Sequence, residues 1–225
     1  MVEEHLTNLK DIAAVIACRG GSLRVTNKNI RPFADSTLLE IKIKQLQSVV
    51  DKVYVNSDNQ DILNVASKVG AIAVERDPHY ATNSIPMNEV YKNVTENVPH
   101  EHILYAHVTS PLIKTSTIKE CVDIYNNLSN GYDSLCTVQT LKKFTWYEGK
   151  AINYNADQMP RSQDLPDYHM IAFAINILPK NILISYKNIV TKNYYPFILD
   201  DLEAVDIDDA LEFEIAEYLY KQYRL

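Results

Sequence analysis

Residues 12–29 read IAAVIACRGGSLRVTNKN. The first seven of them are apolar and include β-branched residues, which predicts a buried strand over Ile12–Cys18. Two consecutive glycines, Gly20 and Gly21, follow and indicate that the strand ends in a loop. In an open α/β sheet this loop would lie where such sheets bind ligands, beyond the carboxyl ends of the strands.

The rest of the chain alternates between short β-branched runs and longer segments with apolar residues at helical spacing. This alternation predicts an α/β fold with a mostly parallel sheet and helices on both faces. We expect further strands over residues 52–56, 71–75, 103–108, 134–138, 170–177 and 204–208. We expect helices over residues 38–50, 61–69, 87–98, 116–128 and 209–222, with Gly70 as a left-handed C-terminal cap and Asp208 as an N-terminal cap.

The alternating pattern loosens near residues 140–170, where Trp146, Gly149, Pro160 and Pro166 interrupt it. This stretch predicts an excursion from the main sheet, which could be a subdomain, a lid or a dimer arm. Neither an internal repeat nor a low-complexity linker divides the chain, so we expect one domain over residues 1–225.

Composition narrows the class of protein. The 225 residues include 22 basic and 29 acidic side chains, a formal net charge of -7, which disfavours nucleic acid as a partner. The three cysteines, Cys18, Cys121 and Cys136, are far apart and odd in number, so we expect a reducing, cytoplasmic location rather than a disulfide framework or a zinc cluster. The early apolar run is too short for a membrane span, and residues 1–11 lack the regions of a signal peptide. We therefore expect no membrane partner.

The loop after the first strand has a local excess of positive charge. Residues 12–34 include Arg19, Arg24, Lys28 and Arg31 and no acidic side chain. In a net-acidic protein this excess fits a polyphosphate, and the glycines let backbone amides approach it. The spacing matches neither a Walker A loop nor GxGxxG. A solvated basic loop with a Gly-Gly turn is the alternative.

A second group of charges lies near the end of the chain, where residues 205–209 read VDIDD. On a strand, Asp206 and Asp208 would point to the same face and offer hard oxygen ligands to a Mg²⁺ ion that bridges phosphates. The alternative is that these acids only cap the following helix. Between Lys192 and Lys221 the chain has no basic residue, so their counter-charge is expected to be a metal or the basic loop. Together the two groups fit nucleotidyl transfer.

Residues 159–166, MPRSQDLP, form a third candidate site. Arg161 and Gln163, held between two prolines, suit a carboxylate or phosphate ligand, whereas a turn that pairs Arg161 with Asp164 is the alternative. His107 stands at the end of a predicted strand, facing the expected cleft. It could contact a hydroxyl of a bound substrate, act as a base, or be structural.

These segments carry a resemblance to a known family. In chain order they are Arg19–Ser22 with Lys28–Asn29, VNSD at 55–58, TSPL at 109–112, PRSQDLP at 160–166 and VDID at 205–208. They resemble the motifs ARGGSK…KN, VSTD, TSPL, PRRQDLP and IDID of the acylneuraminate cytidylyltransferases, the CMP-sialic acid synthetases. The resemblance covers the chain from about Ile12 to its end.

The resemblance implies a Rossmann-like nucleotidyltransferase fold, usually dimeric, with an excursion that meets the partner subunit. It implies a Mg²⁺-dependent reaction of CTP with an acidic 2-keto sugar of sialic, legionaminic or pseudaminic type, which gives a CMP-sugar and pyrophosphate for surface glycan synthesis. By the match, Arg19 and Lys28 would be catalytic and hold the triphosphate, and Asp206 and Asp208 would bind Mg²⁺. The remaining implied site residues are Gly20, Gly21, Ser22 and Asn29 for the nucleotide and Arg161, Gln163 and His107 for the sugar.

The chain also departs from the family's pattern. His107 stands where the family commonly has Gln, and residues 172–176 read AFAIN where the family has NGAIY. Leu23 replaces a lysine of the signature loop, and Met87 falls near a position that relatives fill with a small polar residue. The phosphate and metal motifs are thus kept while the acceptor pocket differs. Two alternatives stay open: a cytidylyltransferase for a phosphonate, phosphosugar or polyol, and a non-catalytic nucleotide-binding protein.

Overall fold

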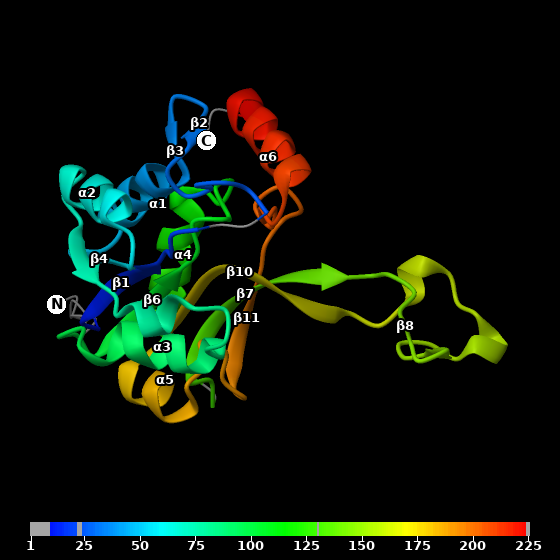
Figure 1. Cartoon of the computed structure of the whole chain (residues 1–225). Coiled ribbons are helices and arrows are strands. Elements are labelled where there is room, and N and C mark those ends of the chain that lie inside the picture. Colours follow the sequence, from blue (N-terminus) through cyan, green and yellow to red (C-terminus); the bar gives the residue numbers. More distant parts are fainter. Residues whose placement is uncertain (1–9, 22–23, 130, 224–225) are drawn as a thin grey trace, which may run out of the picture.

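A seven-stranded sheet forms the centre of the computed structural model, which describes residues 10–21, 24–129 and 131–223. The strand order is β11-β7-β10-β6-β1-β4-β5 (Figure 1). Only β10 runs antiparallel to its neighbours within this sheet of described residues, and the other adjacent pairs are parallel. The strands are β1 (Ile12–Ala17), β4 (Val53–Ser57), β5 (Ile72–Glu75), β6 (His102–Ala106), β7 (Ser134–Leu141), β10 (Tyr168–Pro179) and β11 (Tyr194–Ile198).

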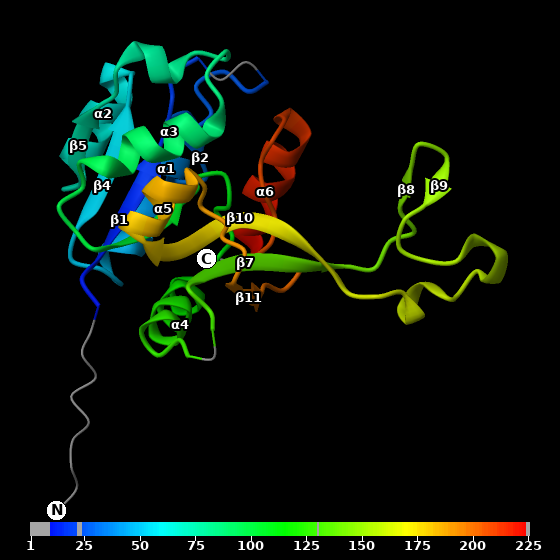
Figure 2. The ribbon, with the colours of Figure 1, turned by 90° about the horizontal axis from the view of Figure 1, so that it is seen from below.

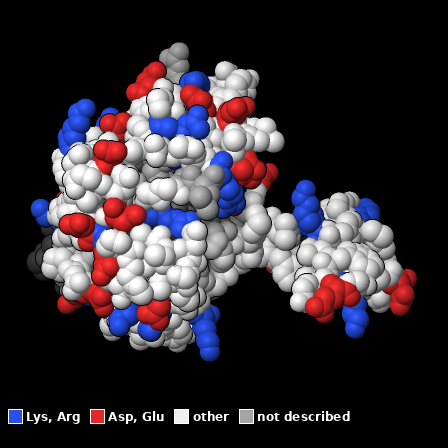
Figure 3. All heavy atoms as spheres, in the orientation of Figure 1, with Lys and Arg blue, Asp and Glu red and all other residues white. Residues whose placement is uncertain are grey.

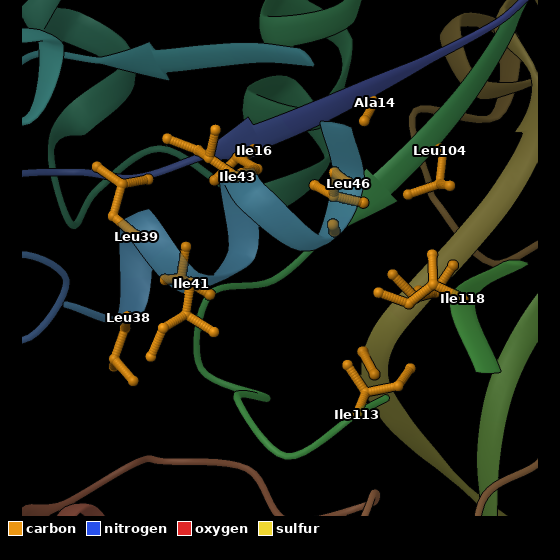
Figure 4. Close-up of a cluster of buried hydrophobic side chains, with 14 of the residues drawn as sticks. Ala14, Ile16, Leu38, Leu39, Ile41, Ile43, Leu46, Leu104, Ile113 and Ile118 are labelled. Carbon is orange, nitrogen blue, oxygen red and sulfur yellow. The ribbon is translucent and has the colours of Figure 1, made fainter. Parts of the chain in front are cut away.

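Helices cover both faces of the sheet. Ala14 and Ile16 of β1 pack into one core and Ala13 and Val15 into another, so β1 is buried on both sides. A strand buried on both faces is a continuous apolar run rather than an alternating one, as residues 12–18 are. Figure 4 shows Leu39, Ile43 and Leu46 packing beside β1 in the first core. The first core is formed with α1 (Leu38–Gln47), α2 (Gln60–Lys68), α4 (Thr115–Asn126) and α6 (Ala210–Tyr223), and the second with α3 (Met87–Glu96) and α5 (Lys180–Tyr186).

The predicted fold class is confirmed, and the predicted helices and all predicted strands but the one before the last helix lie within a few residues of the observed ones. Gly70 has a φ of +84° directly after α2, as expected of a left-handed cap. The sequence pattern missed α5 and β11. Helix α5 is only seven residues long and buries Leu183 alone, so its periodicity is weak. Strand β11 has an interior proline and partly exposed side chains, which obscure a strand pattern.

The predicted excursion near residues 140–170 is a long arm. Strands β7 and β10 continue beyond the sheet, and Figures 1 and 2 show the arm standing clear of the rest of the molecule. Large apolar side chains are exposed along it, among them Trp146, Tyr147, Met159 and Met170. Its outer part contains β8 (Trp146–Tyr147), β9 (Lys150–Ala151) and the short 3-10 helices η2 (Ala156–Gln158) and η3 (Ser162–Asp164).

Two local expectations near the end of the chain were wrong. Residues 205–208 are not a strand, because the backbone there is tied to a neighbouring loop rather than to a strand: the Ile207 amide donates to the Thr109 carbonyl, 2.9 Å away. The N-terminal cap of α6 is Asp209, not Asp208. Asp209 Oδ1 accepts from the Glu212 amide at 2.9 Å, and Glu212 accepts from the Asp209 amide at 3.0 Å. This reciprocal pair is a capping box, whose spacing of three residues selects Asp209.

Within the described residues, no helix combines the length and apolar character that a membrane crossing requires.

Candidate active site

A cavity of about 330 Å³ opens where β1 and β6 end. Because the carboxyl ends of parallel strands meet at one edge of a sheet, loops far apart in sequence line this one cavity. In the space-filling view, blue side chains gather near the middle of the body, with red ones close by (Figure 3). The residues that line the cavity are Ala17, Cys18, Arg19, Arg24, Val25, Lys28, Asn29, His107, Val108, Thr109 and Asp208.

A second cavity, of about 380 Å³, adjoins the first. Both are lined by Ala17, Arg19 and His107, so they form two parts of one cleft. The second cavity is lined by aromatic and aliphatic side chains together with the guanidinium of Arg76. Its other lining residues are Arg76, Tyr80, Ala81, Thr82, Asn83, Ile85, Met87, Val90 and Tyr105.

Three cations of the loop after β1 line the first cavity, and each is held by an acceptor of the protein. Arg19 donates to Asn83 Oδ1. Arg24 Nη2 lies 2.9 Å from Asp208 Oδ1, and Lys28 Nζ donates to the Ile207 carbonyl at 2.6 Å. Burial lowers the pKa of Lys28, whereas Asp206 and Asp208 act to raise it. A phosphate could take the place of each acceptor, since it offers stronger anionic oxygens.

The two glycines have physical reasons to be glycines. A Cβ at Gly20 would lie 3.1 Å from Asn59 Cβ, and the Gly20 amide donates to Asp58 Oδ1 at 2.9 Å. Gly21 has a φ of +67°. Asn29, a predicted nucleotide-binding residue, is buried and lines the cavity. Ser22, the other predicted nucleotide-binding residue of this loop, lies outside the described residues.

Asp206 and Asp208 differ in environment. Asp206 is half-buried, and within the described residues its Oδ1 is buried with no hydrogen-bond partner. Burial raises the pKa of Asp206, the charge of Asp208 raises it further, and a hydrogen bond with Thr109 and the charge of Lys28 lower it. Asp208 is exposed and pairs with Arg24.

The donor set at this position fits a hard divalent cation. An unpartnered carboxylate oxygen on Asp206, with a second carboxylate two residues later, offers the oxygens that Mg²⁺ takes. Over residues 10–21, 24–129 and 131–223, no group of three or more His, Cys, Asp or Glu side chains could hold a metal ion. A cation here would therefore need further oxygens from a bound ligand, as Mg²⁺ commonly takes from phosphates.

His107 stands between the two cavities. Its backbone amide donates to the Ala174 carbonyl at 3.2 Å, and its ring contacts those of Tyr105 and Phe173. Burial, with a smaller effect of the Lys42 charge, lowers the pKa of His107 to about 4. The imidazole is therefore neutral at neutral pH. Among the described residues its Nε2 atom is buried and has no hydrogen-bond partner.

Arg161 and Gln163 lie on the arm and are not among the described residues that line either cavity. Arg161 Nε pairs with Asp164 Oδ2 at 2.8 Å, the turn weighed as the alternative from sequence. The Gln163 carbonyl accepts from Lys142 Nζ at 3.1 Å. A single subunit thus does not bring these two predicted sugar-binding residues to its own cleft.

Arg76 is a cleft residue that the sequence did not single out. It is buried, with Nε donating to Asn56 Oδ1 at 2.6 Å and Nη2 donating to the Asn56 carbonyl at 2.9 Å. The signal that could have found it is its place directly after β5, at the same edge of the sheet as Asn56, the second residue of the VNSD motif.

Known proteins resemble this chain over nearly all of its length. It is 23% identical to "Post-translational flagellin modification protein B" of Campylobacter coli, with 96% of this chain and 98% of that protein covered. It is 26% identical to pseudaminic acid cytidylyltransferase of Campylobacter jejuni, with 92% and 95% covered. The solved structure of CMP:2-keto-3-deoxy-manno-octonic acid synthetase complexed with CTP has a TM-score of 0.70 at 13% identity, with 95% and 99% covered, which shows a shared fold.

Residues 13–222 match the family described as Cytidylyltransferase. The matched residues include the basic loop after β1 and the two carboxylates before α6. The chain belongs to the cytidylyltransferase family.

Proposed function

We propose that this protein transfers a cytidylyl group from CTP to an acidic 2-keto sugar and releases pyrophosphate. The observation that carries the proposal is the meeting of the basic loop and the acidic segment in one cavity, where Lys28 Nζ donates to the carbonyl between Asp206 and Asp208. Relatives matched over almost their whole length support the sugar class, since one is named for pseudaminic acid and another for N,N'-diacetyllegionaminic acid. The product would serve surface glycan synthesis.

The first cavity would hold the triphosphate. Arg19 and Lys28 would neutralise charge that develops on the α-phosphate and on the leaving pyrophosphate, and the backbone at Gly20 and Gly21 allows close approach of phosphate oxygens. The anomeric hydroxyl of the sugar attacks the α-phosphorus in line and gives up its proton to water. A new O–P bond forms as the bond between the α-phosphorus and the oxygen bridging to the β-phosphate breaks, and that oxygen leaves with pyrophosphate. Positioning and charge neutralisation are the protein's main contributions.

Asp206 and Asp208 would hold Mg²⁺ together with phosphate oxygens. The ion, when bound, supplies positive charge at the phosphates. The buried, unpartnered Oδ1 of Asp206 supports this assignment.

The second cavity would hold the nucleobase. It adjoins the phosphate cavity at Arg19 and combines Arg76 with aromatic and aliphatic walls. Such a mixture of apolar surface and a few fixed polar groups suits a flat heterocycle. His107, which lines both parts, would face the acceptor sugar and offer it Nε2.

The sugar site needs a second subunit. We propose a homodimer in which the partner subunit's Arg161 and Gln163 reach the cleft, because the arm holds these residues away from the cleft of their own chain. The exposed apolar side chains of the arm, Trp146 and Tyr147 among them, support burial against another chain. Arg161 suits the sugar carboxylate because its guanidinium binds carboxylates with two parallel hydrogen bonds.

The three cysteines support a reducing compartment. Cys18, Cys121 and Cys136 are free and buried, and unpaired thiols are typical of cytosolic proteins. We therefore place the reaction in the cytoplasm.

Release of pyrophosphate tests the proposed function. Purified protein with Mg²⁺ would receive CTP, or ATP, GTP or UTP as controls, and N-acetylneuraminic, legionaminic, pseudaminic or keto-deoxyoctonic acid. We expect release with CTP and at least one of these acids. Release only with a phosphonate, phosphosugar or polyol would move the protein to another acceptor. CTP binding without release on any acceptor would mean a non-catalytic nucleotide-binding protein.

A further inference from the structure

Strand β10 contains a bulge at the base of the arm. Ile171 pairs with Val138 and Asn176 pairs with Cys136, so residues 172–175 of β10 stand opposite Thr137 alone on β7. Within the bulge, Phe173 has a φ of +47°, in the left-handed region that favours glycine. Bulges beside active sites commonly redirect a side chain, and backbone strain of this kind persists only where the surrounding structure enforces it.

The bulge is fixed from both neighbouring strands. On one side Thr137, which is fully buried, donates from Oγ1 to the Ile175 carbonyl at 3.0 Å and accepts from the Ile175 amide at 3.0 Å. On the other side the His107 amide donates to the Ala174 carbonyl at 3.2 Å. One threonine hydroxyl thus replaces the strand partner that the bulge removes from Ile175. The strained Phe173 backbone is held by these bonds.

The consequence of the bulge is the position of the Phe173 ring. It lies edge-on to His107, with ring centroids 5.4 Å apart, and the residue is 39% exposed. Because β10 runs antiparallel to β6, this early part of β10 lies at the sheet edge where β6 ends and the cleft begins. His107 lines both parts of the cleft, and Phe173, which lines neither, contacts the His107 ring. An acceptor that meets the nucleotide beside His107 would therefore lie next to the exposed part of Phe173.

We propose that Phe173 determines acceptor specificity by packing against an apolar face of the sugar. That face would include a carbon that carries only hydrogens, or a methyl group, at a position where a related sugar carries a hydroxyl. The proposal rests on the proposed function and narrows its substrate to deoxygenated acidic sugars. Contact between an aromatic ring and C–H groups is favourable, whereas a hydroxyl buried against the ring would lose its hydrogen bonds to water without gaining a partner. His107 Nε2 would bond to a hydroxyl that the same sugar keeps, so the two side chains would together select a sugar with one apolar and one polar edge.

The test compares matched acceptors in matched variants. The acceptors are N-acetylneuraminic acid and its 4-, 7-, 8- and 9-deoxy analogues, with kcat/KM measured for each. Phe173→Gly removes the ring at a residue whose backbone conformation glycine adopts freely, and Phe173→Tyr keeps the ring. Tyr186→Ala, which removes an exposed aromatic side chain from the end of α5, is the control.

For the wild type we expect kcat/KM for at least one deoxy analogue to exceed that for the parent sugar by about tenfold. This is the discrimination that a difference of one small group in an apolar pocket typically gives. We expect this ratio to fall to about one in Phe173→Gly, to persist in Phe173→Tyr and Tyr186→Ala, and the KM for CTP to stay unchanged in all three. Equal ratios in the wild type and Phe173→Gly would overturn the proposal and leave the proposed function standing. An equal loss of turnover on every sugar in Phe173→Gly would mean that the bulge only shapes the arm, which also overturns it. Absence of turnover of any acidic sugar by the wild type would overturn both.

Discussion

Lys28 Nζ donates to the backbone carbonyl of Ile207, 2.6 Å away and 179 positions later in the chain. Ile207 separates Asp206 from Asp208, so this hydrogen bond places the cation of the first loop directly beside both carboxylates. Burial lowers the pKa of Lys28, and the charges of Asp206 and Asp208 act to raise it. Burial raises the pKa of Asp206, and the charge of Lys28 acts to lower it. The groups that we propose to bind the phosphates and the metal thus lie next to one another in the folded chain, as preorganised electrostatic catalysis requires.

Lys28→Ala should lower kcat/KM for CTP by about 100- to 1,000-fold, the usual effect of removing one preorganised group that stabilises transition-state charge. The measurement is pyrophosphate release at saturating sugar. Lys44→Ala is the matched control, because Lys44 is an exposed lysine on α1 and lines neither part of the cleft. Turnover of Lys28→Ala within twofold of wild type would show that Lys28 serves only to hold the Ile207 carbonyl.

Asp206→Asn should stabilise the metal-free protein while abolishing turnover. Burial and Asp208 raise the pKa of Asp206, so the folded state binds this proton more tightly than the unfolded state, and the negative charge at neutral pH costs stability. The asparagine removes that charge, and we expect a higher Tm at pH 7 without Mg²⁺.

Asp208→Asn is the comparison for this prediction. Asp208 is exposed, and its ion pair with Arg24, also exposed, contributes about 0–1 kcal/mol. The Tm should therefore change little although turnover falls. A lower Tm for Asp206→Asn than for Asp208→Asn would contradict the account of the Asp206 environment.

Much of the fold followed from the sequence because burial on both faces leaves a distinct pattern. Strand β1, with Ala13 to Ile16 fully buried, is a continuous apolar run, and Gly70 marks the end of α2 by its own conformational freedom. By contrast, the segment before α6 resembles a strand only in its alternation of residues. Its structure depends on the bond from Ile207 to Thr109, a long-range contact that no local pattern contains.

The site was predictable where its residues lie together in sequence. Arg19 and Lys28 belong to one loop, and Asp206 and Asp208 belong to one short segment. Each pair could therefore be recognised as a candidate phosphate or metal ligand from the sequence, although the sequence does not show that the two segments are neighbours in space. Arg76 and Phe173 are single residues, and their proposed roles rest on tertiary contacts, with Asn56 and with His107 respectively. Position in the fold, rather than residue type, is what makes them candidates.

Mixed dimers should show whether Arg161 acts on the cleft of the other subunit. Lys28→Ala and Arg161→Ala chains would be co-expressed with different tags, and the mixed population compared with each variant alone. If the arm acts in the partner, a mixed dimer has one complete cleft, and random mixing should restore roughly a quarter of wild-type turnover from two inactive variants. Activity that stays at the level of the single variants would mean that Arg161 serves its own chain or neither.

Lys42 gives a stability prediction with a definite sign. Its side chain is fully buried in α1, and Nζ donates to the Ser110 carbonyl at 2.9 Å, in the turn that follows β6. Burial lowers the pKa of Lys42 from 10.5 to about 7. Below pH 7 the folded and unfolded states are both protonated, and the buried charge carries its full cost. Between pH 7 and pH 10.5 the unfolded state binds more protons, so stability rises with pH.

Methionine has no titratable group, so Lys42→Met does not share the rise in stability of the wild type between pH 7 and pH 10. The free energy of unfolding of the variant relative to wild type should therefore fall over this range, by at most about 1.4 kcal/mol per pH unit. The measurement is the free energy of urea unfolding of both proteins at each pH. The loss of the hydrogen bond to Ser110 shifts the difference by an amount that does not depend on pH, and groups shared by the two proteins cancel. The slope of the difference is therefore what identifies Lys42. A difference that stays constant across this range would show that Lys42 keeps its ordinary pKa, which would require water or a carboxylate to reach Nζ.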